Sequence, residues 1–502
     1  MPFRGTLRLA WRYVETHALK WRILACALSV LAAAMVSCVV LASPTVRHGD
    51  GFEYIYTAQA FLNHATPDVR ASDISDAQHV LRTRNAHIKI KRDARQGFCQ
   101  APSGKFYSRH FWAYSMMVAP VQWMLRQLGL NELRAFTLFN VLIFLASVVV
   151  VVLFFPDGHD CGGWRMFALL TAIAPAQLYL AWPSPEVACA SLMTCSLVAF
   201  ARGAFPVSVL LSACASWQNP PCAFFAVYAG VHCRANWRRL VRGVLAGSCV
   251  LIPLAFNWLT FGCLNVIESQ GGASWRFVSL DRLWSFWFDI NQGLVVWSAL
   301  PVLAFFFALS CGVARRRWNG MGAVAVVFLS VTLCATTINW NAGNASVIRY
   351  SVWVYPLVAF YVAQTLRWNG LLASVLVCGA VGQAFLCDWP RGNTRYLFHN
   401  AAARAVLDHF PCLYNPEHEI FKDRSAHVNQ AHDGPYTYVL GGQEEGEVRK
   451  ILMSASDVEA AEKDFDIKDR AYWNRMVREL TDRPAYINPP RGAVFKRRRN
   501  GQ

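Results

Sequence analysis

The residues best suited to chemistry stand in a short acidic motif at positions 49–54. Asp50 lies between two glycines, and Glu53 follows three positions later. Glycine neighbours let a substrate approach a carboxylate closely, and the amino end of a helix would keep that carboxylate ionised, as a base must be. An aspartate before a helix is also a common helix cap. On spacing alone a helix cap is the favoured interpretation of Asp50, and a general base is the alternative.

A second cluster combines Arg109 and His110 with aromatic neighbours in residues 107–112. A guanidinium and an imidazole can bind a lipid-linked phosphate or pyrophosphate through charge-assisted hydrogen bonds. Arginine and aromatic side chains also anchor segments at a membrane surface. The cluster is thus a candidate phosphate site, and an interfacial anchor is equally compatible with it.

A third cluster fills residues 339–350 and ends in Arg349 and Tyr350. Amides such as that of Asn341 suit sugar hydroxyls, and Arg349 suits a phosphate. The alternative is a loop that is polar only because it lies outside the bilayer. As a binding segment, it predicts contacts to both a sugar and a phosphate.

Two further polar residues stand at or near membrane depth. Glu186 follows a proline in a turn, and Asn219 precedes two prolines. Ionisable groups at such depth are usually functional or paired. No metal-ligand spacing of the CxxC kind occurs, and Glu417-His418-Glu419 is expected to be an exposed, solvated triplet. No metal site or cofactor is therefore predicted, and the need for a divalent metal ion stays open.

The composition excludes a soluble globule. With 55% hydrophobic residues, 16% charged residues and a mean hydropathy of +0.27, the 502-residue chain has too few polar side chains to cover a water-facing surface. Residues 1–387 carry +16 of the net charge of +17. Basic loops in a membrane part favour anionic or phosphate-bearing lipids over nucleic acid as partners. P-loop, GxGxxG, GxSxG and HExxH contexts are missing, which weighs against nucleotide-driven pumping, Rossmann redox chemistry and serine or zinc hydrolysis.

Apolar runs predict an all-α polytopic membrane domain over residues 21–387, with about eleven transmembrane helices of the length that a bilayer requires. Basic residues ahead of the first run place the amino-terminal residues 1–20 in the cytoplasm. The predicted spans are 21–43, 111–129, 136–155, 166–182, 187–204, 207–232, 243–262, 291–311, 320–338, 351–366 and 370–387.

The order of the early spans has two solutions. Simple alternation places Glu186 on the cytoplasmic side. In the favoured alternative, residues 111–129 lie at the interface, and residues 207–232 break at Gln218-Asn219-Pro220-Pro221 into two short helices, which places Glu186 outside. Consecutive prolines break a helix, and such breaks occur where backbone lines a cavity.

Two polar regions flank the membrane domain. The outer loop 44–110 is far longer than a typical connection and holds an apolar stripe over residues 52–62, which predicts an amphipathic interfacial helix. Residues 388–502 have balanced charge and predict a small extracytoplasmic α+β domain. Its expected elements are a helix over 394–409, a hairpin of 436–440 with 448–453, and a helix over 457–480.

Taken together, these features resemble the GT-C superfamily of integral-membrane glycosyltransferases, which includes protein O-mannosyltransferases and the lipid A aminoarabinose transferase. The resemblance is one of arrangement over residues 20–387. It is carried by Gly49-Asp50-Gly51-Phe52-Glu53-Tyr54, by the turn with Glu186, and by Arg349-Tyr350 running into a span with Pro356. The segments Asp289-Ile290-Asn291-Gln292-Gly293-Leu294 and Tyr414-Asn415-Pro416-Glu417 look similar to an uncharacterised bacterial branch of that superfamily.

The resemblance implies an inverting hexosyl or pentosyl transferase that uses a polyprenyl-phosphate sugar donor on the outer face of the membrane. It implies Asp50 as the general base and Glu53 as its helper or as an orienting group. The Gly-Phe pair between these acids departs from the commonest pattern, so which carboxylate is the base stays open. The donor-phosphate and sugar-binding residues would be Arg349, Tyr350, Arg109, His110, Asn341, Glu186 and Asn219.

Two rival functions remain. A transporter or flippase of a lipid-linked sugar would also use broken helices, but its charges should lie near the bilayer midplane. An O-antigen polymerase or ligase would place its large loop late in the chain. The carboxylates here cluster in an early outer loop, which favours the transferase. The expected acceptor is a lipid, glycan or protein of the cell envelope, and the expected location is a bacterial inner membrane.

Overall fold

A computed structural model describes residues 50–84, 97–156, 163–314, 321–341, 343, 347–387, 389, 397–428, 434–442, 447–489 and 495–497. The predicted cytoplasmic segment 1–20 and the first predicted span, 21–43, lie outside the described residues. Most of the described chain is helical, as the composition predicts.

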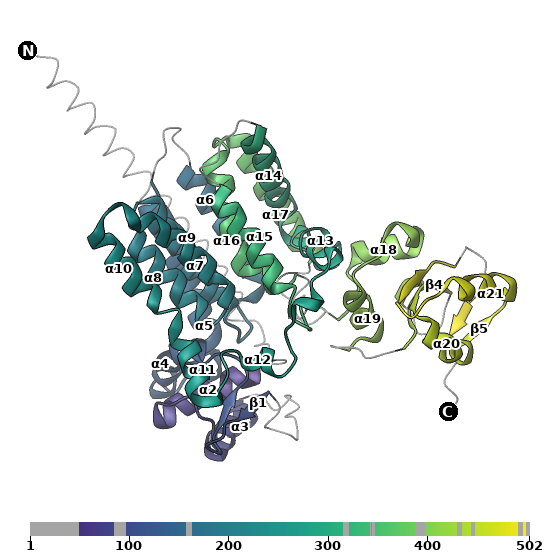
Figure 1. Ribbon diagram of the computed structural model, residues 1–502, viewed down its shortest axis with the longest axis horizontal. Helices are drawn as coiled ribbons and strands as arrows, with labels where there is room; N and C mark the ends of the chain where they lie inside the picture. The colour runs from purple at the N-terminus through teal and green to yellow at the C-terminus, as the bar shows by residue number, and fades with distance from the viewer. Residues whose placement is uncertain are drawn as a thin grey trace, which may run out of the picture.

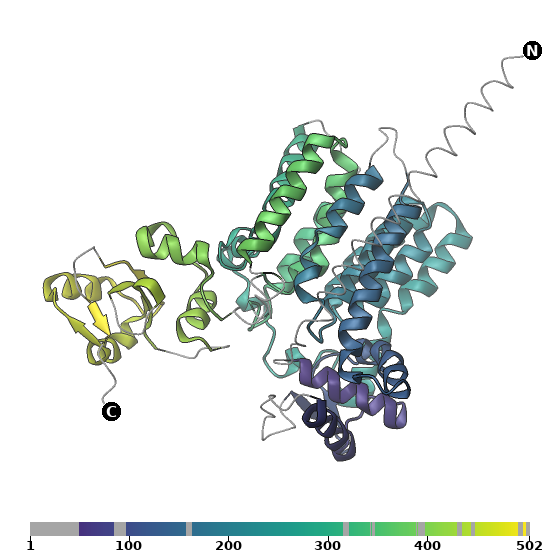
Figure 2. The same cartoon turned by 180° about the vertical axis from the view of Figure 1, so that it is seen from behind.

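A bundle of apolar helices forms the body of the molecule (Figures 1 and 2). Helix α16 lies at its centre, and all its residues from Ser351 to Ala363 are buried. The bundle consists of α5 (Ala135–Phe154), α6 (Gly163–Ala172), α7 (Glu186–Ala201), α8 (Phe205–Ser216), α9 (Ala223–Val231), α10 (Trp237–Ser248), α11 (Leu251–Phe261), α14 (Val295–Ala314), α15 (Met321–Cys334), α16 (Ser351–Thr365) and α17 (Gly370–Leu386).

Three helical stretches in the described part of the chain are long and apolar enough to cross a membrane: Glu132–Phe154, Trp237–Phe261 and Val295–Val313. Large apolar side chains on the second stretch point outward, with Leu259 84% exposed and Leu245 65% exposed. A helix that exposes such side chains suits lipid rather than water. The number of crossings, about eleven by the length rule, stays a prediction.

The chain breaks where the prolines predict a break. Helix α8 ends at Ser216, a 3-10 turn follows at Pro220–Cys222, and α9 then runs to Val231. Helices α8 and α9 pack against each other. Because proline cannot donate a backbone hydrogen bond, the segment between them leaves the helical path and presents Gln218 and Asn219 to the interior.

The polar loop after position 49 folds into a compact layer at one end of the bundle (Figure 1). It contains α2 (Gly51–His64), α3 (Ala71–Arg84), the antiparallel strands β1 (Phe98–Gln100) and β2 (Phe106–Ser108), and α4 (Ala113–Gln127); α12 (Val266–Ser269) lies beside it. Helix α2 forms where the apolar stripe predicts a helix. Its residues Glu53 to Ala60 are all buried, so α2 is covered on every face rather than lying with one face free at the interface.

The carboxyl-terminal part combines helices with small sheets beside α13 (Leu280–Phe288) (Figures 1 and 2). The expected hairpin is present as β3 (Tyr436–Val439) paired with β4 (Val448–Met453). Its other elements are α18 (Ala401–His409), α19 (His418–Ala426), α20 (Val458–Asp464), β5 (Phe465–Ile467), α21 (Arg470–Glu479), β6 (Ala485–Ile487) and β7 (Phe495–Arg497).

The single helix expected over residues 457–480 is wrong. Strand β5 divides it into α20 and α21, because the backbone of Phe465–Ile467 pairs in antiparallel register with β7. The helical periodicity on both sides of this strand carries no signal of a partner about thirty residues further along.

The remaining short elements connect the helices. They are the 3-10 turns at Glu132–Arg134, Pro175–Tyr179, His232–Ala235, Trp275–Phe277, Pro411–Leu413, Leu440–Gly442 and Ala455–Asp457.

Candidate active site

A large cavity, with a volume of about 460 Å³, lies between the layer that contains α2 and α4 and the ends of the bundle helices. Its lining comes from the start of α2, the segment before α4, the end of α15 and the start of α16. The helix break at residues 218–221 and the start of α7 close its floor. Concave sites of this size with a few convergent charges are the usual form of a small-molecule site.

Asp50 and Arg349 meet inside this cavity. Arg349 donates from Nη1 to Oδ2 of Asp50 over 2.5 Å, and from Nη2 to the hydroxyl of Tyr350 over 3.1 Å. The side chain of Asp50 is 27% exposed and that of Arg349 12% exposed. Asp50 does stand at the amino end of α2, but its side chain makes no capping hydrogen bond. The plain cap is therefore not its role, and its carboxylate faces a cation and open space.

Glu53 anchors the opposite side of the cluster. Its Oε2 accepts from Ser108 Oγ at 2.7 Å and lies 3.0 Å from His110 Nδ1. Gly97 passes directly against it, with a φ of +93°, and a Cβ there would come within 2.2 Å of Glu53 Oε1. Only glycine fits that approach and that backbone conformation. Glu53 is thus fixed by the β1–β2 hairpin, whereas the carboxylate of Asp50 pairs with Arg349 and lies near His110.

His110 bridges the two carboxylates. Its Nε2 lies 3.5 Å from Asp50 Oδ2, and its Nδ1 faces Glu53. Burial disfavours the charged ring, but the negative charges of Asp50 and Glu53 outweigh it and raise the pKa of His110 to about 9. The ring is therefore an imidazolium at neutral pH, with both nitrogens as donors.

Glu186 and Asn219 meet on the floor of the cavity. Asn219 Nδ2 donates to Glu186 Oε2 over 3.1 Å, and Glu186 Oε1 lies 4.0 Å from Arg349 Nε. Only 4% of the Glu186 side chain is exposed. A buried carboxylate needs such partners, since its desolvation is otherwise costly. The five charged side chains Asp50, Glu53, His110, Glu186 and Arg349 are called the charged cluster below.

The structure brings together eight of the nine residues that the sequence singles out. Arg109 lies at the cavity wall with an exposed side chain, and Tyr350 packs under Arg349, whose guanidinium lies 5.0 Å from the ring centroid. The exception is Asn341, which is 1% exposed and does not line the cavity. Asn341 binds Glu419, Asp423 and Arg424 of the carboxyl-terminal part. We therefore do not propose it as a sugar ligand.

Some residues at the site were not predicted as site residues from the sequence. Ser108, which donates to Glu53, and Gln218, which lines the cavity, each stand next to a predicted site residue, and that adjacency was the available signal. Gln218 Oε1 accepts from the backbone of Tyr114, which ties the helix break to α4. Asn265 and Thr336 line the same cavity from distant segments. No local pattern in the sequence distinguishes them.

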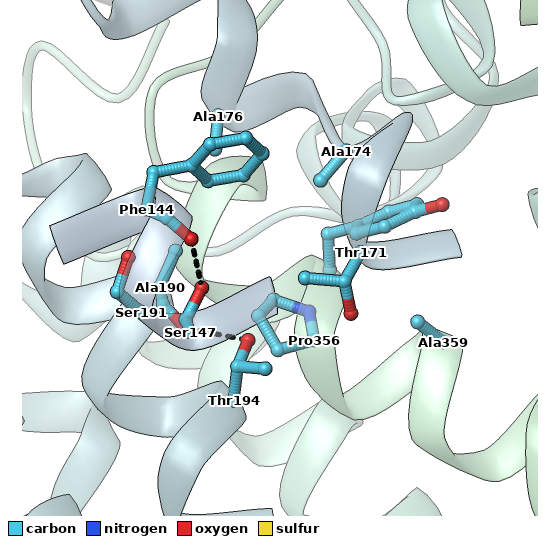
Figure 3. A pocket seen from close by; sticks show the side chains of 11 residues that line it. Phe144, Ser147, Thr171, Ala174, Ala176, Ala190, Ser191, Thr194, Pro356 and Ala359 are labelled. Atoms are coloured by element: carbon cyan, nitrogen blue, oxygen red, sulfur yellow. Dashed lines mark hydrogen bonds between the residues drawn. The ribbon is translucent and has the colours of Figure 1, made fainter. Parts of the chain in front are cut away.

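A second cavity, inside the bundle, has a volume of only about 10 Å³ (Figure 3). Three of its hydroxyls bond to their own helices: Ser147 Oγ donates to Phe144 O, Thr171 Oγ1 to Phe167 O and Thr194 Oγ1 to Ala190 O. A cavity of this size holds at most about one water molecule. It is therefore no site for a sugar.

A divalent cation would find three ligands in the charged cluster. Ligand atoms of Asp50, Glu53 and His110 all lie within 4.8 Å of one another. Binding there would require His110 to lose its proton and Asp50 to give up Arg349. A metal ion and a proton compete for the same ring nitrogen of His110. The three residues therefore fit a metal only once the proton and the pairing with Arg349 are lost.

Comparison with known proteins gives likeness in structure only. No family model and no curated protein matches the chain. Among solved structures it is similar to ArnT from Cupriavidus metallidurans in the apo state, with 15% identity, a TM-score of 0.45 and coverage of 78% of this chain and 69% of that one. It is also similar to the Archaeoglobus fulgidus oligosaccharyltransferase in complex with Zn and sulfate, with 11% identity, a TM-score of 0.39 and coverage of 81% and 57%.

At these identities and TM-scores the likeness assigns no role to any residue of this chain. Both solved proteins are members of the GT-C superfamily, the one that the sequence motifs resemble.

Proposed function

We propose that the protein is an inverting glycosyltransferase that moves a sugar from a polyprenyl-phosphate donor to a hydroxyl of a cell-envelope acceptor. The observation that carries the proposal is the Asp50–Arg349 pair inside the large cavity. A carboxylate that can take a proton and a guanidinium that can hold a phosphate are the two groups that such a transfer needs.

The reaction is a single displacement. The acceptor oxygen attacks the anomeric carbon as Asp50 takes the proton of its hydroxyl. The bond between that carbon and the phosphate oxygen breaks, and the phosphate leaves with the electron pair. Arg349 neutralises the charge that develops on the phosphate. One displacement inverts the anomeric configuration.

Binding of the donor would also free the base. The donor phosphate competes with Asp50 for Arg349, whose second Nη group is bound by Tyr350. Once the guanidinium turns to the phosphate, Asp50 loses its strongest partner and becomes available to the acceptor. Chemistry is thereby coupled to the presence of the donor, which limits unproductive proton transfer in the empty site.

The neighbouring residues have supporting roles in this proposal. The His110 imidazolium, which Glu53 holds in place, lies near the same oxygen of Asp50, Oδ2, that accepts from Arg349. Glu186 and Asn219 orient Arg349 from the floor of the cavity. Arg109, exposed at the wall, is placed to meet the lipid-linked phosphate first.

A lipid-linked donor accounts for the setting of the cavity. The bundle exposes apolar side chains along α10 and α11, and the sequence carries no nucleotide-binding motif. We place the enzyme in a bacterial inner membrane, with the cavity and the carboxyl-terminal part on the outer side. The proposed sugar is a hexosyl or pentosyl group, and the proposed acceptor is a lipid, glycan or protein of the cell envelope.

The test is sugar transfer in nanodiscs with labelled polyprenyl-phosphate sugars and envelope extract as acceptor. Wild-type protein should form a glycosylated product, and Asp50→Asn should bind the donor without forming it. Donor translocation in proteoliposomes without any glycosylated product would instead favour the flippase. Elongation of a polymer already linked to the donor lipid would favour the polymerase or ligase.

A further inference from the structure

Three segments far apart in the sequence meet at one buried arginine. Arg424, on α19, is 1% exposed. Its Nη1 donates to Asn341 Oδ1 over 2.6 Å, and its Nη2 donates to the side-chain oxygen of Gln292. Neither partner belongs to the carboxyl-terminal part: Gln292 precedes α14, and Asn341 stands in the segment before α16. Arg424 therefore joins two loops of the bundle to α19.

From these two partners the connection runs to Arg349. The backbone oxygen of Gln292 accepts from the amide of Ile348 over 2.9 Å. The next residue in the chain is Arg349. Val347 is held in addition by the hydroxyl of Tyr179 at 2.7 Å. The backbone that carries Arg349 into the cavity is thus fixed by Gln292, whose side chain is in turn held by Arg424.

The same junction unites two segments that the proposed reaction leaves without a role. Tyr414 donates to Asp289 Oδ2 over 2.9 Å, which joins residues 414–417 to residues 289–294. Arg282 of α13 lies 3.4 Å from Glu417 and 2.8 Å from Glu419. The side chains of Arg282, Gln292, Asn341, Glu417, Glu419 and Arg424 are called the C-terminal junction below.

We propose that Arg424 is a positioning residue for Arg349, so that the carboxyl-terminal part governs transfer without lining the cavity. The proposal rests on the proposed function. A planar guanidinium can hold two carbonyl oxygens at fixed separation, which a flexible ammonium cannot do. Charge stabilisation in a transition state depends on placement, and a displacement of about 1 Å can cost about 100-fold in rate.

The first experiment compares Arg424→Met with a matched control, Arg449→Met. Arg449 is also buried in the carboxyl-terminal part, but it binds Glu447 and the backbone of Asp408 within that part. Hydrogen exchange in a peptide that begins at or before residue 345 and ends at residue 353 reports the amide of Ile348. We expect Arg424→Met to speed that exchange about tenfold or more, and Arg449→Met to leave it at the wild-type rate.

Turnover supplies the second measurement. Arg424→Met should lower kcat by about 10- to 100-fold with an unchanged KM for the acceptor, because only the placement of Arg349 is altered. Arg449→Met should keep the wild-type kcat per folded molecule. Adding Gln292→Met to Arg424→Met should lower kcat no further, since both variants break the same connection.

Three outcomes would overturn the proposal: wild-type exchange in Arg424→Met, equal losses in Arg424→Met and Arg449→Met, or fully additive losses in the double variant. The exchange measurement needs no substrate. A wild-type protein without transfer activity would therefore count against the proposed function, while the exchange rates would still decide whether Arg424 fixes the backbone at Arg349.

Discussion

The charged cluster and the C-terminal junction contain the same kinds of side chain in opposite settings. In the charged cluster, Asp50 and Arg349 pair at the wall of a 460 Å³ cavity, and Asp50 keeps 27% of its side chain exposed. In the junction, Arg282 binds Glu419 and the backbone oxygens of Ala335 and Thr337 in packed surroundings.

The difference separates charges that can change partner from charges that cannot. A carboxylate that faces a cavity can exchange its arginine for a substrate group, and its ionisation can be used in a reaction. A charge enclosed by several fixed partners contributes to structure, and removing one partner leaves the others buried without compensation. Changes in the charged cluster should therefore alter turnover, and changes in the junction should alter stability or position.

The largest effect is expected for Asp50→Asn. Loss of a general base costs about 10²- to 10⁴-fold, and we expect kcat to fall by about 10³-fold with the thermal midpoint nearly unchanged. Transfer assays and scanning fluorimetry on the same preparation measure both quantities. Asp76→Asn, an exposed aspartate of α3, is the control. If Glu53→Gln loses more activity than Asp50→Asn, then Glu53 is the base.

Arg349→Met should follow, with a loss of kcat of about 10²- to 10³-fold, because the phosphate would lose its counter-charge in the transition state. Arg349→Lys should recover part of the activity, since it restores the charge but not the double hydrogen bond to Asp50 and Tyr350. Single-turnover kinetics with saturating donor measures the chemical step. Equal rates in Arg349→Met and wild type would remove Arg349 from the reaction.

Arg282→Met tests the other side of the comparison. The substitution leaves Glu417 and Glu419 without their arginine. We expect the free energy of unfolding to fall by about 3 kcal/mol, which is the lower end of the range for a broken buried ion pair. Denaturant titration in nanodiscs measures the change. Replacing both glutamates by glutamine in the same variant should restore most of the loss. An unchanged stability would mean that this ion pair is structurally dispensable.

The pH dependence of kcat should report the protonation of His110. Because the pKa of His110 is raised from 6.5 to about 9, its contribution to stability is fully present below pH 6.5 and disappears as the pH rises through about 9. The neutral ring then no longer offsets the negative charges of Asp50 and Glu53, and we expect kcat to fall about tenfold by pH 10. His110→Gln should lack this alkaline limb, and His79→Gln, at an exposed histidine, should retain it. A limb that persists in His110→Gln would belong to another group.

Local sequence patterns were enough to predict several helices of the bundle and the helix break, but not the end of α6 at Ala172, inside the predicted span 166–182. Apolar runs predict helices such as α5 and α16, and the two prolines after Asn219 predict where α8 must end, because proline removes a backbone donor wherever it stands. Residue type likewise selected Asp50 and Arg349 as chemical groups. These properties depend on a residue and its near neighbours, so they can be read from the chain itself.

Only the tertiary structure decided which of these groups work together. Asp50 and Arg349 are 299 positions apart, and neither local sequence indicates that the other residue is its partner. Asn341 and Asn219 are alike in the sequence, yet one binds Arg424 in the junction and the other binds Glu186 in the cavity. A hydrogen bond between residues far apart in the sequence forms only when the packing of whole helices brings them within reach. Local sequence patterns contain no information on that distance.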